Sequence, residues 1–186
     1  MTSANKKIFE AIRAIKADGG SSVRALIDKG IDLEVRDGWG RTPLQIGVVR
    51  GDLGLCRLLI EAGANVNAKG EMRYRGETAL CIAASWGNVD PGAQLCRVLL
   101  DAGARVGHRQ RCGWTALHYA AANSCIDTCI VLIESGASIE ATTYDGRTIG
   151  DVASPGVNQF LLAVREAKEL HQITSKAPAV PKAVRL

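Results

Sequence analysis

Cysteine and histidine are the side chains in this sequence that most often act as nucleophiles or metal ligands. The chain has six cysteines, and three of them, Cys56, Cys96 and Cys129, each lie seven residues before a glycine in copies of one repeated phrase. Leucine and isoleucine surround these three, so each is expected to pack as a small buried hydrophobe. Neither a Cys-x-x-Cys pair nor the Cys/His spacing of a zinc site is present. We therefore predict no metal centre and no cofactor.

The remaining residue types that commonly support catalysis are scattered along the chain. There are three histidines, and the sequence contains no phosphate-binding glycine loop, no HExxH helix and no GxSxG nucleophile turn. The carboxylates fall at expected helix ends and in turns. For Asp37 the sequence predicts a structural role in holding a turn. These patterns predict that the protein is not an enzyme.

One phrase occurs four times and defines the elements of the chain. Its copies read LCRLLIEAGANVNA at 55–68, LCRVLLDAGARVGH at 95–108, TCIVLIESGASIEA at 128–141 and, in diverged form, SVRALIDKGIDLEV at 22–35. A second marker, Gly-x-Thr, recurs at 40–42, 76–78, 113–115 and 146–148. Self-similarity at a period of 33 to 40 residues indicates a stacked array of repeats.

Each repeat is predicted to contain two helices. Thr42 is suited to cap the first helix of one repeat, and Pro43 is suited to its first turn, where a missing N–H costs nothing. The stretch LGLCRLLIEA has leucines at helical spacing and marks the second helix. Gly63 is expected to end that helix in a left-handed conformation. An extended excursion then leads to the next Gly-x-Thr.

These features resemble the ankyrin repeat. The resemblance rests on DGWGRTPL, on GWTALHYAA and on three LLxxGA-type endings. It implies an all-α repeat solenoid, in which helix-turn-helix pairs are joined by hairpin-like finger loops and capping repeats close both ends. The family phrase T-P-L-H-x-A is kept only in part, because Gln45 and Cys81 replace the histidine that survives as His118.

On this basis the chain divides into six segments. They are an N-terminal capping repeat at 1–36, ankyrin repeats at 37–69, 70–108 and 109–142, a C-terminal capping repeat at 143–170 and a flexible tail at 171–186. The second repeat carries two insertions, one in its finger and one between its helices. The tail is assigned because it has two prolines and no helical period.

The resemblance also implies where a partner binds, namely at the finger tips and at the exposed end of each first helix. All three tryptophans fall at these positions and alternate with arginines, so we expect them to be exposed and to anchor a partner. The predicted partner-binding residues are Trp39, Arg41, Arg50, Tyr74, Arg75, Glu77, Trp86, Arg111, Trp114, Asn123, Tyr144 and Arg147.

The charges of this set favour an acidic partner. Its five arginines against one glutamate give +4, which equals the formal net charge of the whole chain. A basic stripe on one face steers an acidic partner towards it. The planar guanidinium is also suited to carboxylates and phosphates.

Two functions of different classes remain open. The first is a non-enzymatic protein–protein interaction module, acting as a small adaptor or steric inhibitor that is monomeric by itself and binds an acidic surface of another protein. The alternative is binding of a nucleotide or single-stranded nucleic acid, in which tryptophans stack on bases and arginines hold phosphates. The modest pI of about 8.8 favours the first.

The sequence also bears on location. Many unpaired cysteines and a charged start, unlike a secretory signal, predict a reducing, cytoplasmic compartment, with the nucleus as the alternative. The chain contains no apolar run of membrane-spanning length, so we expect no membrane contact.

Overall fold

The computed structural model describes residues 3–71, 76–87 and 91–176. Within these ranges the chain forms ten α-helices and no β-strand. Their bounds are α1 Ser3–Asp18, α2 Ser21–Asp28, α3 Pro43–Val49, α4 Leu53–Glu61, α5 Ala79–Ala84, α6 Gly92–Asp101, α7 Ala116–Ala122, α8 Ile126–Glu134, α9 Ile149–Val152 and α10 Pro155–Lys176. None of these helices, including the long α10, is apolar enough over a sufficient length to cross a membrane.

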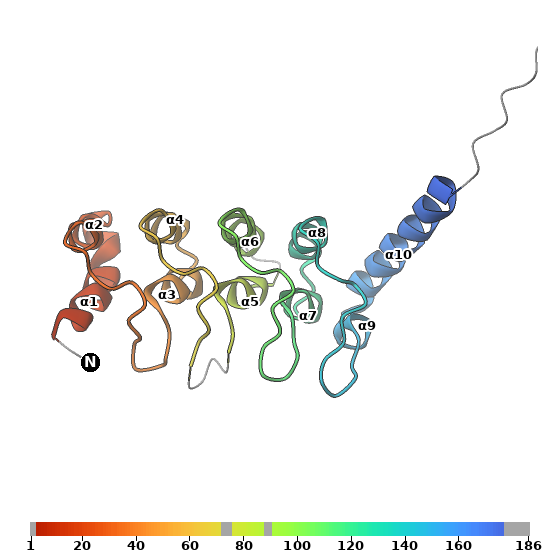
Figure 1. Ribbon diagram of the computed structural model, residues 1–186, viewed down its shortest axis with the longest axis horizontal. Helices are drawn as coiled ribbons and strands as arrows, with labels where there is room; N and C mark the ends of the chain where they lie inside the picture. The colour runs from red at the N-terminus through yellow and green to blue at the C-terminus, as the bar shows by residue number, and fades with distance from the viewer. Residues whose placement is uncertain (1–2, 72–75, 88–90, 177–186) are drawn as a thin grey trace, which may run out of the picture.

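The helices form two layers that run along the array. Figure 1 shows α1, α3, α5, α7 and α9 in one layer and α2, α4, α6 and α8 in the other, with a long loop after each of the even-numbered four. All four loops project on the side of the odd-numbered layer. The expected all-α repeat solenoid with finger loops is confirmed.

Local signals in the sequence determine where the helices begin and end. The Thr42 hydroxyl accepts a hydrogen bond from the Gln45 backbone N–H at 3.3 Å, and the Gln45 Oε1 accepts one from the Thr42 N–H at 3.0 Å. This reciprocal cap, with Pro43 following it, begins α3. Gly63 follows α4 with φ +89° and so allows the left-handed turn that closes the helix. Both predictions are confirmed.

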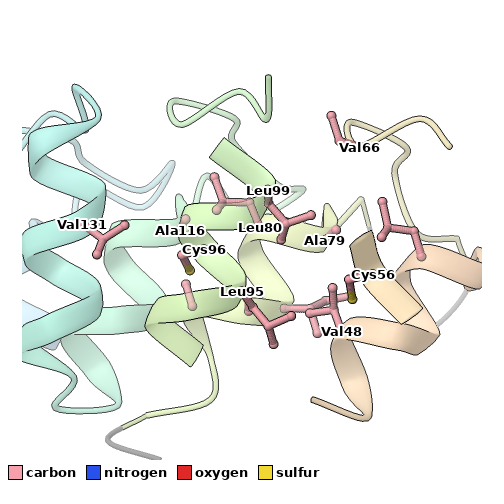
Figure 2. Close-up of a cluster of buried hydrophobic side chains, with 14 of the residues drawn as sticks. Val48, Cys56, Val66, Ala79, Leu80, Leu95, Cys96, Leu99, Ala116 and Val131 are labelled. Carbon is pink, nitrogen blue, oxygen red and sulfur yellow. The ribbon is translucent and has the colours of Figure 1, made fainter. Parts of the chain in front are cut away.

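The core lies between the two layers and continues from repeat to repeat. Leu80 of α5 and Leu95 and Leu99 of α6 are almost completely buried, as Figure 2 shows for the central repeats. Cys56, shown in the same view, is also fully buried. Because each repeat buries its apolar face only against its neighbours, the array is stabilised as a stack.

The repeated cysteines are confirmed as core residues. Cys56, Cys96 and Cys129 have no exposed surface. Burial, which disfavours the thiolate, raises the pKa of each of these thiols to about 12. At neutral pH they therefore remain protonated and unreactive.

Gln45 ties the first full repeat to the next one. Its side-chain amide donates hydrogen bonds to the carbonyl oxygens of Ala68, at 3.2 Å, and of Glu77, at 3.0 Å. The buried glutamine thus links α3 to the loop that precedes α5. These two hydrogen bonds hold adjacent repeats in register. If the repeats shifted, both carbonyl groups would lose their hydrogen-bond partner, which costs free energy.

The C-terminal helix is longer than the sequence analysis predicts. We expected a flexible tail from residue 171, whereas α10 continues to Lys176. The residues HQITSK contain neither glycine nor proline, so nothing in them ends a helix. The first obstacle is Pro178, which disfavours helical backbone at the residue before it. Residues 177–186 of the expected tail lie outside the described ranges.

Candidate functional site

The candidate site is built on the four long loops, which we call fingers 1 to 4. Finger 1 spans residues 29–42, finger 2 spans 62–78, finger 3 spans 102–115 and finger 4 spans 135–148. Finger 2 is three residues longer than the other three. Figure 1 shows the fingers side by side in a row, so that equivalent positions recur along one edge of the array.

The turn of finger 1 is organised around Asp37. One carboxylate oxygen accepts hydrogen bonds from the backbone N–H groups of Trp39 and Arg41, both at 2.9 Å. The other oxygen accepts from Nε and Nη2 of Arg41, at 2.9 and 2.7 Å. Burial by itself would raise the pKa of Asp37, but the hydrogen bonds from Arg41 and Trp39 outweigh it and hold the pKa below its ordinary value. The predicted turn-holding role of Asp37 is confirmed.

Finger 4 contains a similar ion pair. Arg147 donates from Nε and Nη2 to one oxygen of Asp145, at 2.9 and 2.7 Å, and Thr143 donates to the other. The hydrogen bonds from Arg147 and Thr143 lower the pKa of Asp145 to about 2. Arg41 and Arg147 therefore each face an aspartate of their own finger. The predicted basic stripe counted both arginines but neither aspartate.

The three tryptophans occupy different environments. Trp39, at the tip of finger 1, is 48% exposed. Trp86, which follows α5, is half-buried, and its Nε1 donates to the carbonyl oxygen of Val48 in the preceding repeat at 3.0 Å. Trp114 is half-buried in finger 3 with its ring 5.1 Å from the ring of Tyr119. Trp39 is exposed, as expected. Trp86 and Trp114 are less exposed than expected, because their side chains pack between elements.

The remaining predicted residues are placed as follows. Arg50, Arg111 and Asn123 are exposed, and Tyr144 at the tip of finger 4 is 68% exposed. The side-chain amide of Asn123 donates to the carbonyl of Tyr119 at 2.9 Å, so it also closes the end of α7. The predicted residues Tyr74 and Arg75 lie outside the described ranges.

Glu77 belongs to a half-buried hydrogen-bonded chain. Its Oε1 accepts from the hydroxyl of Tyr119 at 2.8 Å, and that hydroxyl accepts from the side-chain amide of Gln110 at 2.8 Å. Burial raises the pKa of Glu77, and the bond from Tyr119 opposes the rise. The chain links finger 2, finger 3 and α7 on the side where the fingers meet the helices.

A recess opens between fingers 2 and 3. It has a volume of about 430 Å³ and is lined by Lys69, Glu71, Gly76, His108, Arg109, Gln110 and Arg111. Among these residues, only Arg111 was predicted from the sequence to bind a partner. The others went unnoticed because the recess depends on the spacing of two fingers, which no motif within one repeat encodes.

The space around three equivalent glycines, Gly40, Gly76 and Gly113, shows how closely neighbouring fingers approach each other. All three have positive φ, near +84°. A Cβ at Gly40 would lie 2.8 Å from the backbone of Glu71, and one at Gly113 would lie 2.6 Å from the backbone nitrogen of Tyr144. At Gly76 the nearest atom of the described residues, the backbone nitrogen of Arg111, is 3.9 Å away. Finger 2 is therefore more widely separated from finger 3 than the fingers of the other two pairs are.

The described residues contain no group of three or more histidine, cysteine, aspartate or glutamate side chains that is able to hold a metal ion. The carboxylates of Asp37, Glu71 and Asp145 in the fingers instead form ion pairs with arginines. As far as its residues are described, the site is an extended, solvent-facing edge that carries two exposed aromatic side chains, Trp39 and Tyr144, and a basic recess.

Comparison with known proteins gives a consistent result. The family model for ankyrin repeats matches residues 39–71, and a model covering three copies of the repeat matches residues 69–143. A probable E3 ubiquitin-protein ligase, XBOS34, from Oryza sativa is 32% identical over 81% of the chain, and B-cell lymphoma 3 protein from Homo sapiens is 32% identical over 60%. These alignments cover 22% and 24% of the two relatives, so the chain corresponds to less than a quarter of either protein.

Proposed function

The chain belongs to the ankyrin repeat family, and on that premise we propose that it binds another protein across its fingers and the adjoining helix ends. Repeats of this family are protein–protein interaction modules. One observation carries the proposal: two large aromatic side chains, Trp39 and Tyr144, remain exposed at the tips of the first and last fingers. Exposed tryptophan and tyrosine are enriched at protein interfaces, where a few such side chains supply most of the binding energy.

The shape of the site supports a macromolecular partner. The fingers form a continuous row, and their exposed side chains are spread along its length rather than gathered in one enclosed cavity. A partner that contacts two or three fingers would bury about 800 Å² on each side, which is typical of a specific protein complex. Arg50 and Arg111, both exposed, favour an acidic partner surface.

We propose that binding itself is the activity, so that the chain works as an adaptor or steric inhibitor rather than an enzyme. The carboxylates of the fingers support this view because they are engaged in structural contacts. Asp37 and Asp145 are paired with arginines, and Glu77 accepts a hydrogen bond from Tyr119.

The test is capture of interacting proteins by the native chain and by the variant Trp39→Ala/Tyr144→Ala. We expect one or a few proteins that the native chain retains after nuclease treatment and that the variant loses by at least about tenfold. The control variant is Arg57→Ala/Arg97→Ala, which alters exposed positions on α4 and α6, in the layer away from the fingers. Equal capture by all three chains would contradict the proposed surface. Capture that nuclease abolishes would favour nucleic acid instead.

A further inference from the structure

The backbone contacts between fingers group them into two pairs. The N–H of Glu71 in finger 2 donates to the carbonyl of Gly40 in finger 1 at 3.1 Å, and the N–H of Tyr144 in finger 4 donates to the carbonyl of Cys112 in finger 3 at 3.2 Å. In the described residues, fingers 2 and 3 are linked instead by side-chain hydrogen bonds. Nε2 of His108 lies 2.9 Å from the carbonyl oxygen of Gly76, and the side chain of Asn67 donates to the carbonyl of Gly103 at 3.0 Å and accepts from the N–H of Arg105 at 2.8 Å. The recess occupies the gap between the two pairs.

The positive charges that line this recess are not offset as those of Arg41 and Arg147 are. Lys69 and Arg111 are exposed, and neither forms an ion pair with any residue in the described part of the chain. Arg109 lies over the ring of Tyr144, 4.9 Å from its centroid, and donates to the carbonyl of Thr142. Neither a ring nor a carbonyl carries a negative charge that would neutralise the guanidinium.

The described lining of the recess contains one carboxylate, that of Glu71, and it is already paired. Oε1 of Glu71 forms an ion pair with Nε of Arg36 in finger 1, at 3.2 Å. Lys69, Arg109 and Arg111 therefore present uncompensated positive charge around one hollow. By contrast, the guanidinium groups of Arg41 in finger 1 and Arg147 in finger 4 are held by aspartates at 2.7 Å.

We propose that this recess takes the carboxylates of an acidic peptide segment on the protein partner, an inference that rests on the proposed function and locates its electrostatic contact. The hollow accommodates a few side chains rather than a folded surface. Two guanidinium groups and an ammonium group provide planar and point-charge donors for carboxylates.

The lining of the recess favours carboxylates over nucleic acid. Single-stranded nucleic acid is held by aromatic faces on which bases stack as well as by positive charge. Among the described residues that line the recess, none is tryptophan, tyrosine or phenylalanine. Arg109 itself lies over the ring of Tyr144, 4.9 Å from its centroid.

The experiment uses a fluorescein-labelled peptide of about 12 alternating glutamate and alanine residues, followed by fluorescence anisotropy at about 50 mM salt. The variant is Lys69→Glu/Arg111→Glu. The control is Arg57→Glu/Arg97→Glu, which makes the same change in net charge at exposed positions in the layer away from the fingers. We expect the recess variant to bind at least about tenfold more weakly than the native chain and the control to change by about twofold or less.

Three results would overturn the inference. They are equal weakening by both variants, absence of binding to the native chain, and recess-dependent binding of a single-stranded oligonucleotide that exceeds binding of the glutamate peptide. A second variant, Lys69→Gln/Arg111→Gln, removes the charge without reversing it. It replaces the glutamate variant in the same measurement if the glutamate variant does not fold. A glutamine–alanine peptide should not bind, since it lacks the carboxylates.

The outcomes also separate this inference from the proposed function. If the Trp39→Ala/Tyr144→Ala variant loses its captured protein, but the recess variant binds the glutamate peptide as tightly as the native chain does, only the inference fails. If the native chain binds the peptide through the recess but retains no protein, the proposed function fails and the recess remains an acid-binding site.

Discussion

The arginines of the fingers fall into two groups according to what faces each guanidinium. Arg41 and Arg147 donate to Asp37 and Asp145 at 2.7 Å, which offsets their charge within one finger. Arg111 is exposed and makes no ion pair with the described residues. Long-range attraction depends on charge that is not locally compensated. The electrostatic part of recognition is therefore expected to depend on Arg111 more than on Arg41 or Arg147.

Trp86 and Trp39 also differ in what surrounds them, and this difference predicts their effects on stability. Trp86 donates to the carbonyl of Val48, and its ring packs beside Gly51 in the preceding repeat. Trp86→Ala should lower the free energy of unfolding by about 2–3 kcal/mol, because it removes a hydrogen bond and half-buried apolar area. Trp39→Ala should cost less than about 1 kcal/mol. Urea denaturation of both variants measures the difference, and equal losses would contradict this assignment.

At the scale of the elements, the sequence predicted those features that are specified within a few residues. The cap at Thr42, the proline that follows it and the left-handed Gly63 are local signals, and the helices begin and end accordingly. The burial of Trp86 and the recess beside Lys69 were not predicted. Both depend on contacts between neighbouring repeats, and a motif within one repeat carries no information about its distance from the next.

The finger glycines offer a direct test of how the fingers are spaced. Gly40, Gly76, Gly113 and Gly146 all have φ near +84°, so alanine at any of them costs about 1–2 kcal/mol in backbone strain. At Gly113 a Cβ would also collide with the Tyr144 backbone at 2.6 Å, whereas at Gly146 no described atom lies within 4 Å. The collision should add about 1–3 kcal/mol.

Gly113→Ala and Gly40→Ala are therefore expected to lower the free energy of unfolding more than Gly76→Ala and Gly146→Ala do. Thermal and urea unfolding of the four variants provide the measurement, with Gly146→Ala as the control for strain alone. If Gly76→Ala were as costly as Gly113→Ala, fingers 2 and 3 would have to lie closer together than the structure places them. The recess between them would then be smaller than described.

At the scale of the whole molecule, stability comes from stacking, and the end of the array shows where stacking stops. Val157 and Leu161 of α10 are buried against the last repeat, and Arg165 pairs with Glu140 at 2.8 Å. Residues 166–170 of the same helix are exposed. Figure 1 shows α10 projecting obliquely beyond the array. The first two turns of this helix therefore act as the cap, and its later turns lie outside the stack.

This division predicts that residues 167–176 of α10 are dispensable for folding. A chain that ends at Glu166 keeps Val157, Leu161 and the Arg165–Glu140 ion pair, so its free energy of unfolding should fall by less than about 1 kcal/mol. Leu161→Ala in the full-length chain should cost about 2–4 kcal/mol, because it opens a cavity under the last repeat. Urea denaturation compares the two, and hydrogen exchange in α8 and α9 locates any loosening. A larger loss on truncation than on Leu161→Ala would mean that the distal turns of α10 belong to the folded array.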